Sequence, residues 1–489
     1  MSDYIVVKMA TTEISINMHI IDFVIFSIYF LIVLSVGVYF YRRNTTREEY
    51  YVGGRNISAT HVGMSIVATD VGGGFSIGLG GLGFVMGIAG SWLLFTGLVG
   101  AWLASILIVP KIKSIDKKYS MLTFPDFLRY KYNDRVALVA AIISGIGYLG
   151  FTGAQILAGA KLAAGTIFST ISWMDPLNLA LYVMAGIVLF YTVLGGIKAV
   201  IYTDTIQWNV LLGGLLFFGV PYAYYHVGGW QVLKAQLPSN FFSITNISVS
   251  QFINWFFTIV PIWFIAMTLY QRIFACRNES EARKAFYIAG LLEYPLMAFL
   301  GVFLGMISRV FFPEVEAEMG LPMLLRDVLP IGITGIVLAA FFSAIMSTAD
   351  SCLIASSGNI VNDIIKRKLL KDASPKKLIH ISQLTTLIIG FVALIIASAF
   401  ETVLEIILHA YSLMVAGLFF PTIVAYFFKK NDSSAALWSM ILSGSFTLIL
   451  IITRIRLPLG LEASIYGIFF SIIVYYAIII TKKIRNQYV

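Results

Sequence analysis

The stretch HVGMSIVATDVGGGFSIGLGGLG, residues 61–83, is long and apolar enough to cross a membrane, yet it carries an acid and clustered glycines. Asp70 lies just before the glycine run 72–74. Glycines weaken a helix, and a broken helix inside a membrane is tolerated only where protein or a water-filled cavity covers its freed backbone groups. We therefore expect a broken spanning helix at a functional cavity. A small-residue packing face is the alternative, because Gly74 and Gly78 form GxxxG.

The composition indicates an all-α polytopic membrane protein. Of 489 residues, 59% are hydrophobic and 12% are charged, with a mean hydropathy of +0.87. Soluble proteins average about 45–50% apolar and about 25% charged residues, so a soluble multi-domain enzyme, a disordered chain and a fibrous repeat are excluded. The net charge of +9 does not indicate nucleic acid, because basic inner loops raise the charge of any polytopic protein. Two cysteines form neither a disulfide framework nor a thiolate metal cluster, and we expect no cleavable signal.

The hydrophobic pattern predicts thirteen spans. Their ranges are 22–41, 61–86, 90–110, 136–167, 177–196, 203–226, 251–275, 284–311, 331–362, 379–399, 402–427, 434–453 and 462–481. An outside N-terminus and a cytoplasmic C-terminus place 27 Lys and Arg residues on the inner side and 6 on the outer side. This bias agrees with the positive-inside rule, and it predicts a multi-pass protein of the plasma (inner) membrane.

The ninth predicted span carries a stripe of oxygen-bearing side chains. Ala344, Ser347 and Thr348 share one helix face, and Asp350 and Ser351 continue it one turn later. Hydroxyl and carboxylate oxygens suit a hard cation such as sodium. The alternative is that the hydroxyls bond back to carbonyls of their own helix.

Three further residues stand out within the spans. Asp204 lies near the inner end of the sixth span, either as a solvated interface residue or as a partner facing the core. Pro261 can interrupt the seventh span, five spans after the glycine break. Glu293 lies in the eighth span, and the sequence does not identify its partner.

The spacing of the two breaks predicts two inverted repeats within a single transmembrane domain, residues 1–489. The first repeat would span 61–226 and the second 251–430. An extra span and loop, 1–60, would precede them, and two extra spans, 431–489, would follow.

Five segments resemble the sodium/solute symporter family, particularly its proline and choline carriers. They are ATDVGGG (68–74), ILAGAKLA (156–163), YTDTIQ (202–207), YQR (270–272) and AIMSTADS (344–351). The resemblance implies a five-plus-five inverted repeat of the leucine-transporter type, with one extra span before it and two after it.

The resemblance also implies ligands. For a primary sodium ion they are the carbonyls of Ala68, Val71 and Ala344 and the hydroxyls of Ser347 and Thr348. For a second sodium, present in some members, they are Asp204, Ser347, Asp350 and Ser351, where Asp350 replaces a hydroxyl residue. The residues that the resemblance implies for binding the solute are Asp70, Phe75, Phe151 and Trp263.

The function implied is a sodium-coupled symporter that imports a small organic solute by alternating access. An amino acid or related zwitterion is favoured, because Asp70 matches an acid of the proline carriers. A sugar, sugar acid, carboxylate or choline-like cation is an alternative, although two tryptophan positions of choline carriers fall on Asp70 and Ala266.

The alternative from another functional class is a membrane-embedded transferase or a channel-like protein. The sequence has no HExxH or GxSxG motif, and we expect that this protein is not an enzyme. The expected partners are the solute, one or two sodium ions and the lipid bilayer, without nucleic acid. The oligomeric state is open, and a monomer would suffice.

Overall fold

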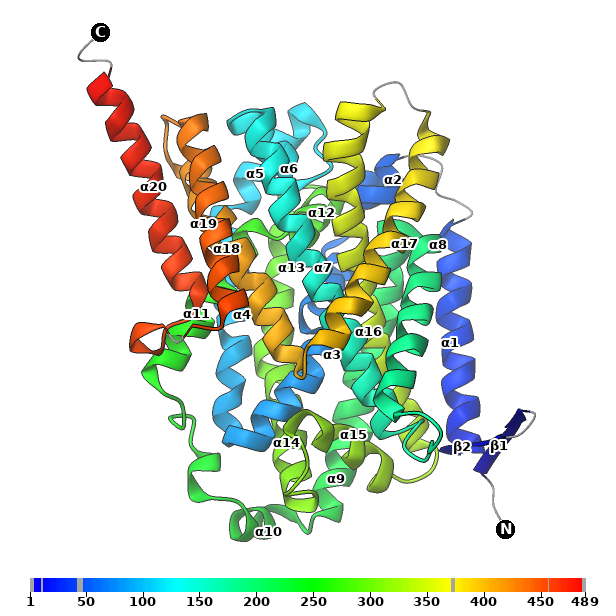
Figure 1. Cartoon of the computed structure of the whole chain (residues 1–489). Coiled ribbons are helices and arrows are strands. Elements are labelled where there is room, and N and C mark those ends of the chain that lie inside the picture. The colour runs from blue at the N-terminus through cyan, green and yellow to red at the C-terminus, as the bar shows by residue number, and fades with distance from the viewer. Residues whose placement is uncertain (1–3, 10–11, 42–46, 371–373, 456, 486–489) are drawn as a thin grey trace.

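The computed structural model describes residues 4–9, 12–41, 47–370, 374–455 and 457–485. They form a helical bundle with two distinct ends (Figure 1). One end carries α5 (Val109–Tyr119), α6 (Phe124–Lys131) and the last turns of α20 (Ala463–Arg485). The other end carries an antiparallel hairpin of β1 (Tyr4–Met9) and β2 (Thr12–His19). Apart from this hairpin, in which neighbouring strands satisfy each other's backbone groups, the elements of the described chain are helices, as the sequence predicted.

Helices also make up the rest of the described chain. The first half contains α1 (Ile20–Tyr41), α2 (Arg47–Val52), η1 (Gly53–Arg55), α3 (Ala59–Met86), η2 (Gly87–Ser91), α4 (Trp92–Leu107), α7 (Asp134–Gly165), α8 (Pro176–Gly213), η3 (Gly214–Gly219), α9 (Val220–His226), α10 (Gly229–Gln236) and η4 (Ser239–Phe242). The second half contains α11 (Val249–Ile265), α12 (Met267–Ala275), α13 (Glu279–Leu292), η5 (Glu293–Ala298), α14 (Phe299–Phe311), α15 (Ala317–Asp327), α16 (Ile333–Gly358), η6 (Asn359–Leu369), α17 (Pro375–Ala399), α18 (Val403–Phe427), α19 (Ser433–Thr453) and η7 (Pro458–Gly460).

The number of spanning helices differs from the predicted thirteen. Among the described residues, nine helical segments are long and apolar enough to cross a membrane, or ten when the bent pair α11 and α12 counts as one span. The described apolar parts Ile20–Val33 and Pro176–Leu189 are shorter than a full span. In addition, the predicted boundary between 177–196 and 203–226 falls inside the continuous helix α8. Length and composition therefore support about nine or ten spans.

Two spanning helices are broken near their middle. Within α3, Gly72 has φ 36° and ψ −176°, which confirms the predicted break beside Asp70. The second break lies at Ala266, between α11 and α12, which meet at an angle of 43°. Pro261, the predicted site of interruption, remains inside α11. The break at Ala266 is stabilised from another helix, because the Tyr148 hydroxyl of α7 accepts a hydrogen bond of 3.1 Å from the Thr268 amide that the break leaves free.

Helix α16 lies at the centre of the bundle. It packs against α3, α7 and α8, and nearly all of its apolar segment is buried. Helix α17 lies at the periphery instead, with a stripe of large exposed apolar side chains at helical spacing, Leu384, Ile388, Phe391 and Ile395. Such a stripe is expected on a helix that faces lipid, while polar chemistry gathers around α16.

Candidate functional site

The broken part of α3 presses directly against α16. A side chain at Gly72 would place its Cβ 2.0 Å from Oγ1 of Thr348, and one at Gly73 would place it 1.6 Å from Cγ1 of Ile345. Gly72 also has a positive φ that favours glycine. The glycine run therefore both breaks the helix and allows close packing. At the two positions of the predicted packing face, a Cβ at Gly74 would lie 2.6 Å from Nε2 of Gln155, whereas one at Gly78 would be in ordinary contact, 3.5 Å from Cβ of Leu404.

Four of the five residues predicted for the primary sodium site come together at this contact. The Ser347 hydroxyl lies 3.0 Å from the carbonyl oxygen of Ala68 on α3 and 2.9 Å from that of Ala344 on α16. The Thr348 hydroxyl lies 2.9 Å from the Ala68 oxygen and 3.1 Å from the Ala344 oxygen. Val71 is fully buried one residue before the break, but its carbonyl forms no hydrogen bond with these hydroxyls in the described region.

The chemistry of this oxygen cluster suits a cation. Each hydroxyl carries one proton and faces two carbonyl oxygens, so the protons cannot satisfy all four contacts at once. A hard cation binds to hydroxyl and carbonyl oxygens without needing a donor. The back-bonding alternative accounts for the contacts with Ala344, but it does not account for those with Ala68 on another helix.

The residues predicted for a second sodium ion lie in separate surroundings. Asp204, on α8, has no exposed surface, so the core-facing alternative is confirmed and the interface alternative is wrong. Its Oδ2 accepts a hydrogen bond of 2.5 Å from Ser65 and lies 3.4 Å from Nη2 of Arg272. The same Nη2 donates to Ser351 and to Thr69, each at 2.7 Å. A buried guanidinium thus links Asp204 to Ser351.

Asp350 faces a different neighbour. It accepts a hydrogen bond from the Thr192 hydroxyl of α8, and it has no ion pair with a described residue. Ser347, the fourth predicted ligand, belongs to the primary cluster. Among the described residues, Asp350 is therefore a buried acid whose partner is a hydroxyl, an arrangement that is costly unless the charge is neutralised.

Two predicted solute residues line a small internal pocket close to the sodium cluster. The pocket is bounded by Asp70, Phe151 and residues of the break at Ala266. Trp263 lies outside its wall, where it contacts Gly100 of α4 and Phe286 of α13. The side chain of Phe75 lies outside the part of the chain that the structure describes.

Among the residues of the pocket wall that the sequence did not predict are three titratable ones, Tyr148, Cys352 and Tyr411. The Tyr411 ring stacks on Phe151 with ring centroids 5.2 Å apart, and its hydroxyl donates to Oδ1 of Asp70 at 3.4 Å. One signal was available for Tyr148, because it precedes Phe151 by three residues and therefore shares its helix face. Tyr411 had no local signal, since only the fold brings α18 beside α3.

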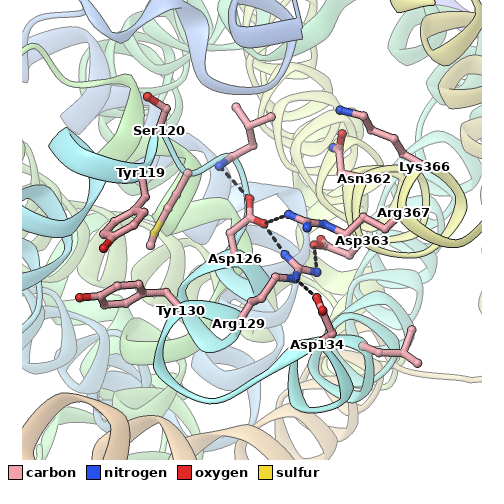
Figure 2. A pocket seen from close by; sticks show the side chains of 13 residues that line it. Tyr119, Ser120, Asp126, Arg129, Tyr130, Asp134, Asn362, Asp363, Lys366 and Arg367 are labelled. Atoms are coloured by element: carbon pink, nitrogen blue, oxygen red, sulfur yellow. Dashed lines mark hydrogen bonds and ion pairs between the residues drawn. The ribbon is translucent and has the colours of Figure 1, made fainter. Parts of the chain in front are cut away.

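A second, larger cleft lies at the end of the bundle that carries α6, and it contains none of the predicted site residues (Figure 2). Arg129 of α6 pairs with Asp126 at 2.5 Å, with Asp134 of α7 at 2.7 Å and with Asp363 of η6 at 3.1 Å. Arg367 of η6 also pairs with Asp126, at 3.0 Å. Burial alone would lower the pKa of the Arg129 guanidinium, but Asp363 and Asp126 raise it above its usual value. This network joins α6 to η6, the helical segment that continues from the end of α16.

Comparison with known proteins shows to which family the sequence is similar. The model of the sodium:solute symporter family matches residues 50–443. The high-affinity proline transporter PutP of Bacillus subtilis is 27% identical over 428 residues, which cover 85% of this chain and 89% of that protein. The sodium/glucose cotransporter 1 of Ovis aries is 25% identical, with 86% of this chain and 70% of that protein covered.

Solved structures show the same fold. A Na+-coupled sialic acid symporter in a substrate-bound outward-open state superposes with a TM-score of 0.75 at 20% identity, covering 93% of this chain and 96% of that chain. Mhp1, a nucleobase-cation-symport-1 family transporter, gives a TM-score of 0.57 at 13% identity, covering 87% and 92%. The architecture is thus shared with transporters that differ widely in sequence.

Proposed function

The chain belongs to the sodium:solute symporter family, and from this premise we propose that it imports a small, amine-bearing solute together with sodium bound between α3 and α16. Sodium-coupled solute import is the function that the family and its members support. The family consists of transporters, which argues against an enzyme. The site residues and the solute class are the finer parts of the proposal.

One observation carries the sodium site: the hydroxyls of Ser347 and Thr348 reach across from α16 to the Ala68 carbonyl, four residues before the break at Gly72. We assign the ion to these three residues and to the carbonyls of Ala344 and Val71. A sodium ion there would hold the broken helix against α16. Its departure would release the two helices from each other, which provides a route from the outward-open to the inward-open state.

The solute would bind in the pocket beside this cluster. Asp70 and Phe151 supply an acid and an aromatic face there. Phe75 remains part of the proposal, whereas Trp263 lies outside this pocket. An amino acid or related zwitterion fits an acid on the wall, and a proline transporter is among the relatives. A sugar is the competing solute class, because other relatives are named for glucose and myo-inositol.

The remaining features follow from the sequence pattern. We propose inverted repeats over 61–226 and 251–430 in a five-plus-five arrangement, within one transmembrane domain. The charge bias places the C-terminus and the end with α5 and α6 in the cytoplasm, and the N-terminus outside. Figure 1 has β1 and the end of α20 at opposite ends of the bundle, as this orientation requires. A monomer in the plasma membrane would be sufficient for this transport.

Uptake into liposomes tests the proposal. Purified protein is reconstituted, and uptake of labelled proline, glucose, myo-inositol and sialic acid is measured under an inward sodium gradient and under an inward potassium gradient. A symporter accumulates at least one solute above the external concentration with sodium only. Equilibration without accumulation would indicate a channel, and conversion of the solute would indicate an enzyme. The Ser347→Ala/Thr348→Ala variant should lose accumulation.

A further inference from the structure

The first helix, α1, carries one buried acid that the proposed site does not use. Asp22 is the single charged residue of the apolar segment Ile20–Val33, and it is only 3% exposed. The side chains of Val24, Ile28 and Leu31 on the same helix are exposed. Helix α1 therefore turns its acid toward the protein and an apolar face outward. An acid in such surroundings is expected to have a specific partner.

The partner of Asp22 is the beginning of α16, the helix that carries most of the proposed sodium ligands. Oδ1 of Asp22 accepts a hydrogen bond of 2.7 Å from the amide of Gly332 and another of 2.7 Å from the amide of Gly335. The first amides of a helix have no partner within that helix. Gly332 is the N-cap residue of α16, and it has no side chain that could accept from them. Asp22 therefore caps α16 from another helix, with the bond that an N-cap side chain usually makes within its own helix.

The two glycines fit this contact. Gly332 has φ 87°, a conformation that favours glycine. A Cβ on Gly335 would lie 2.7 Å from both the Cα atom and the carbonyl oxygen of Asp22. The two backbones thus approach so closely that a side chain at this position would push the helices apart. The beginning of α16 is shaped to receive α1.

The contact between the two helices continues toward the sodium cluster. Three further pairs join them, and these are Phe26 with Phe342, Tyr29 with Ser343, and Val33 with Met346. The aromatic pair meets edge to face with ring centroids 5.2 Å apart, and the two hydroxyls of the second pair are hydrogen-bonded to each other. The pairs follow in the same order along both helices, so α1 runs parallel to α16. Ser343 directly precedes Ala344, which is one of the proposed sodium ligands.

The sodium cluster depends on the position of α16 relative to α3. The hydroxyls of Ser347 and Thr348 lie 3.0 and 2.9 Å from the Ala68 carbonyl oxygen on α3. Binding sites need their ligands within about 0.5 Å of the productive geometry, and neighbouring contacts hold them there. A change in the height or tilt of α16 would move both hydroxyls together. The contacts with α1 oppose such a change at the beginning of α16 and beside the ligands.

We propose that α1 positions the sodium-binding helix, and that Asp22 and Tyr29 are positioning residues for the sodium ion. This inference rests on the proposed function. Neither side chain would contact the ion. Asp22 would fix the height of α16 through its first amides, and Tyr29 would fix α16 beside Ala344. Loss of either contact should therefore weaken sodium binding while every sodium ligand remains in the chain.

Equilibrium binding of radioactive sodium to the purified full-length protein tests this role. Asp22→Ala removes the cap, Asp22→Asn keeps an oxygen that can accept from the same amides, and Tyr29→Phe removes only a hydroxyl. We expect the sodium dissociation constant to rise about three- to tenfold in Asp22→Ala and in Tyr29→Phe, and to stay within about twofold of wild type in Asp22→Asn. Ser35→Ala is the matched control on α1, because its hydroxyl bonds to the Leu31 carbonyl of the same helix.

The melting temperature in sodium-free buffer separates positioning from a purely structural role. Variants that melt earlier but bind sodium like the wild type would overturn the proposal, and so would equal weakening in Asp22→Asn and Asp22→Ala. If Asp22→Ala does not fold, Tyr29→Phe decides, and wild-type sodium affinity in that variant would overturn the role of α1. Absence of sodium binding in the wild type would instead overturn the proposed sodium site, and this role with it.

Discussion

Nη2 of Arg272 lies 3.4 Å from Oδ2 of Asp204, and neither side chain has any exposed surface. The pair lies between α12 and α8, and Arg272 also reaches Ser65 and Thr69 of α3 and Ser351 of α16. One guanidinium therefore connects four helices around the site. Paired buried charges add little net stability, but removing one partner is costly because it leaves the other uncompensated.

We expect Asp204→Asn to destabilise the protein by about 3–5 kcal/mol, the usual effect of breaking a buried pair. The melting temperature in sodium-free buffer measures this loss. Adding Arg272→Gln to Asp204→Asn should recover part of it, because the unpaired cation is then gone. A double-mutant cycle with no coupling between the two positions would contradict the pairing.

Ser347→Ala and Thr348→Ala should each weaken sodium binding strongly. Each removes one oxygen from the cluster at Ala68. A lost bond to a charged group costs about 1.5–3 kcal/mol, so the sodium concentration for half-maximal uptake should rise about 10- to 150-fold. Ser356→Ala on the same helix is the control, because its hydroxyl bonds to Gly145 away from the cluster. Unchanged sodium dependence in both variants would refute the site.

Gly72→Ala should abolish sodium-dependent uptake. The backbone conformation alone would cost an alanine about 1–3 kcal/mol, and its Cβ would collide with Oγ1 of Thr348. The matched control is Gly213→Ala on α8, where a Cβ would meet nothing within 4 Å. Uptake and melting temperature are measured for both variants. Wild-type uptake in Gly72→Ala would show that the break is not required.

Asp350 tests whether a second sodium ion is carried. Its described partner is the Thr192 hydroxyl, whereas Asp204 already has Arg272. We therefore propose that Asp350, rather than Asp204, provides the charge for a second ion, with Ser347 and Ser351 on the same helix. Asp350→Asn should lower the sodium Hill coefficient from near two toward one and reduce the charge moved per solute. A wild-type coefficient of one would refute the second ion and leave the primary site intact.

The sequence predicted local features of the site well. Glycine conformation and helical spacing are local properties, and they identified the break at Gly72 and the Ser347–Thr348 stripe. Partners across helices depend on how distant segments rotate against each other. The approach of Glu293 and Asp70 to the same glycine, Gly97, and the pairing of Lys161 with Glu318 therefore had no local signal. The break at Ala266 was missed for the same reason, since the Tyr148 hydroxyl that binds the freed Thr268 amide comes from α7.

The ion network in Figure 2 should keep the pocket closed toward the end that carries α6. Arg129 joins α6 to Asp363, whose side chain is only 1% exposed, so this pair is screened less than a surface pair. We expect Arg129→Ala to favour opening at this end by about 1–2 kcal/mol, which is roughly a 5- to 30-fold change in population.

Cysteine labelling measures this opening directly. Cys352 lines the pocket and is fully buried, and Cys276→Ser removes the other cysteine. A membrane-impermeant maleimide is applied to inside-out vesicles, which expose the proposed cytoplasmic end. Labelling of Cys352 should be faster in Arg129→Ala than in wild type, and unchanged in Arg135→Ala, an exposed arginine of the neighbouring turn. Faster labelling in right-side-out vesicles would instead mean that the network closes the opposite end, or that the orientation is reversed.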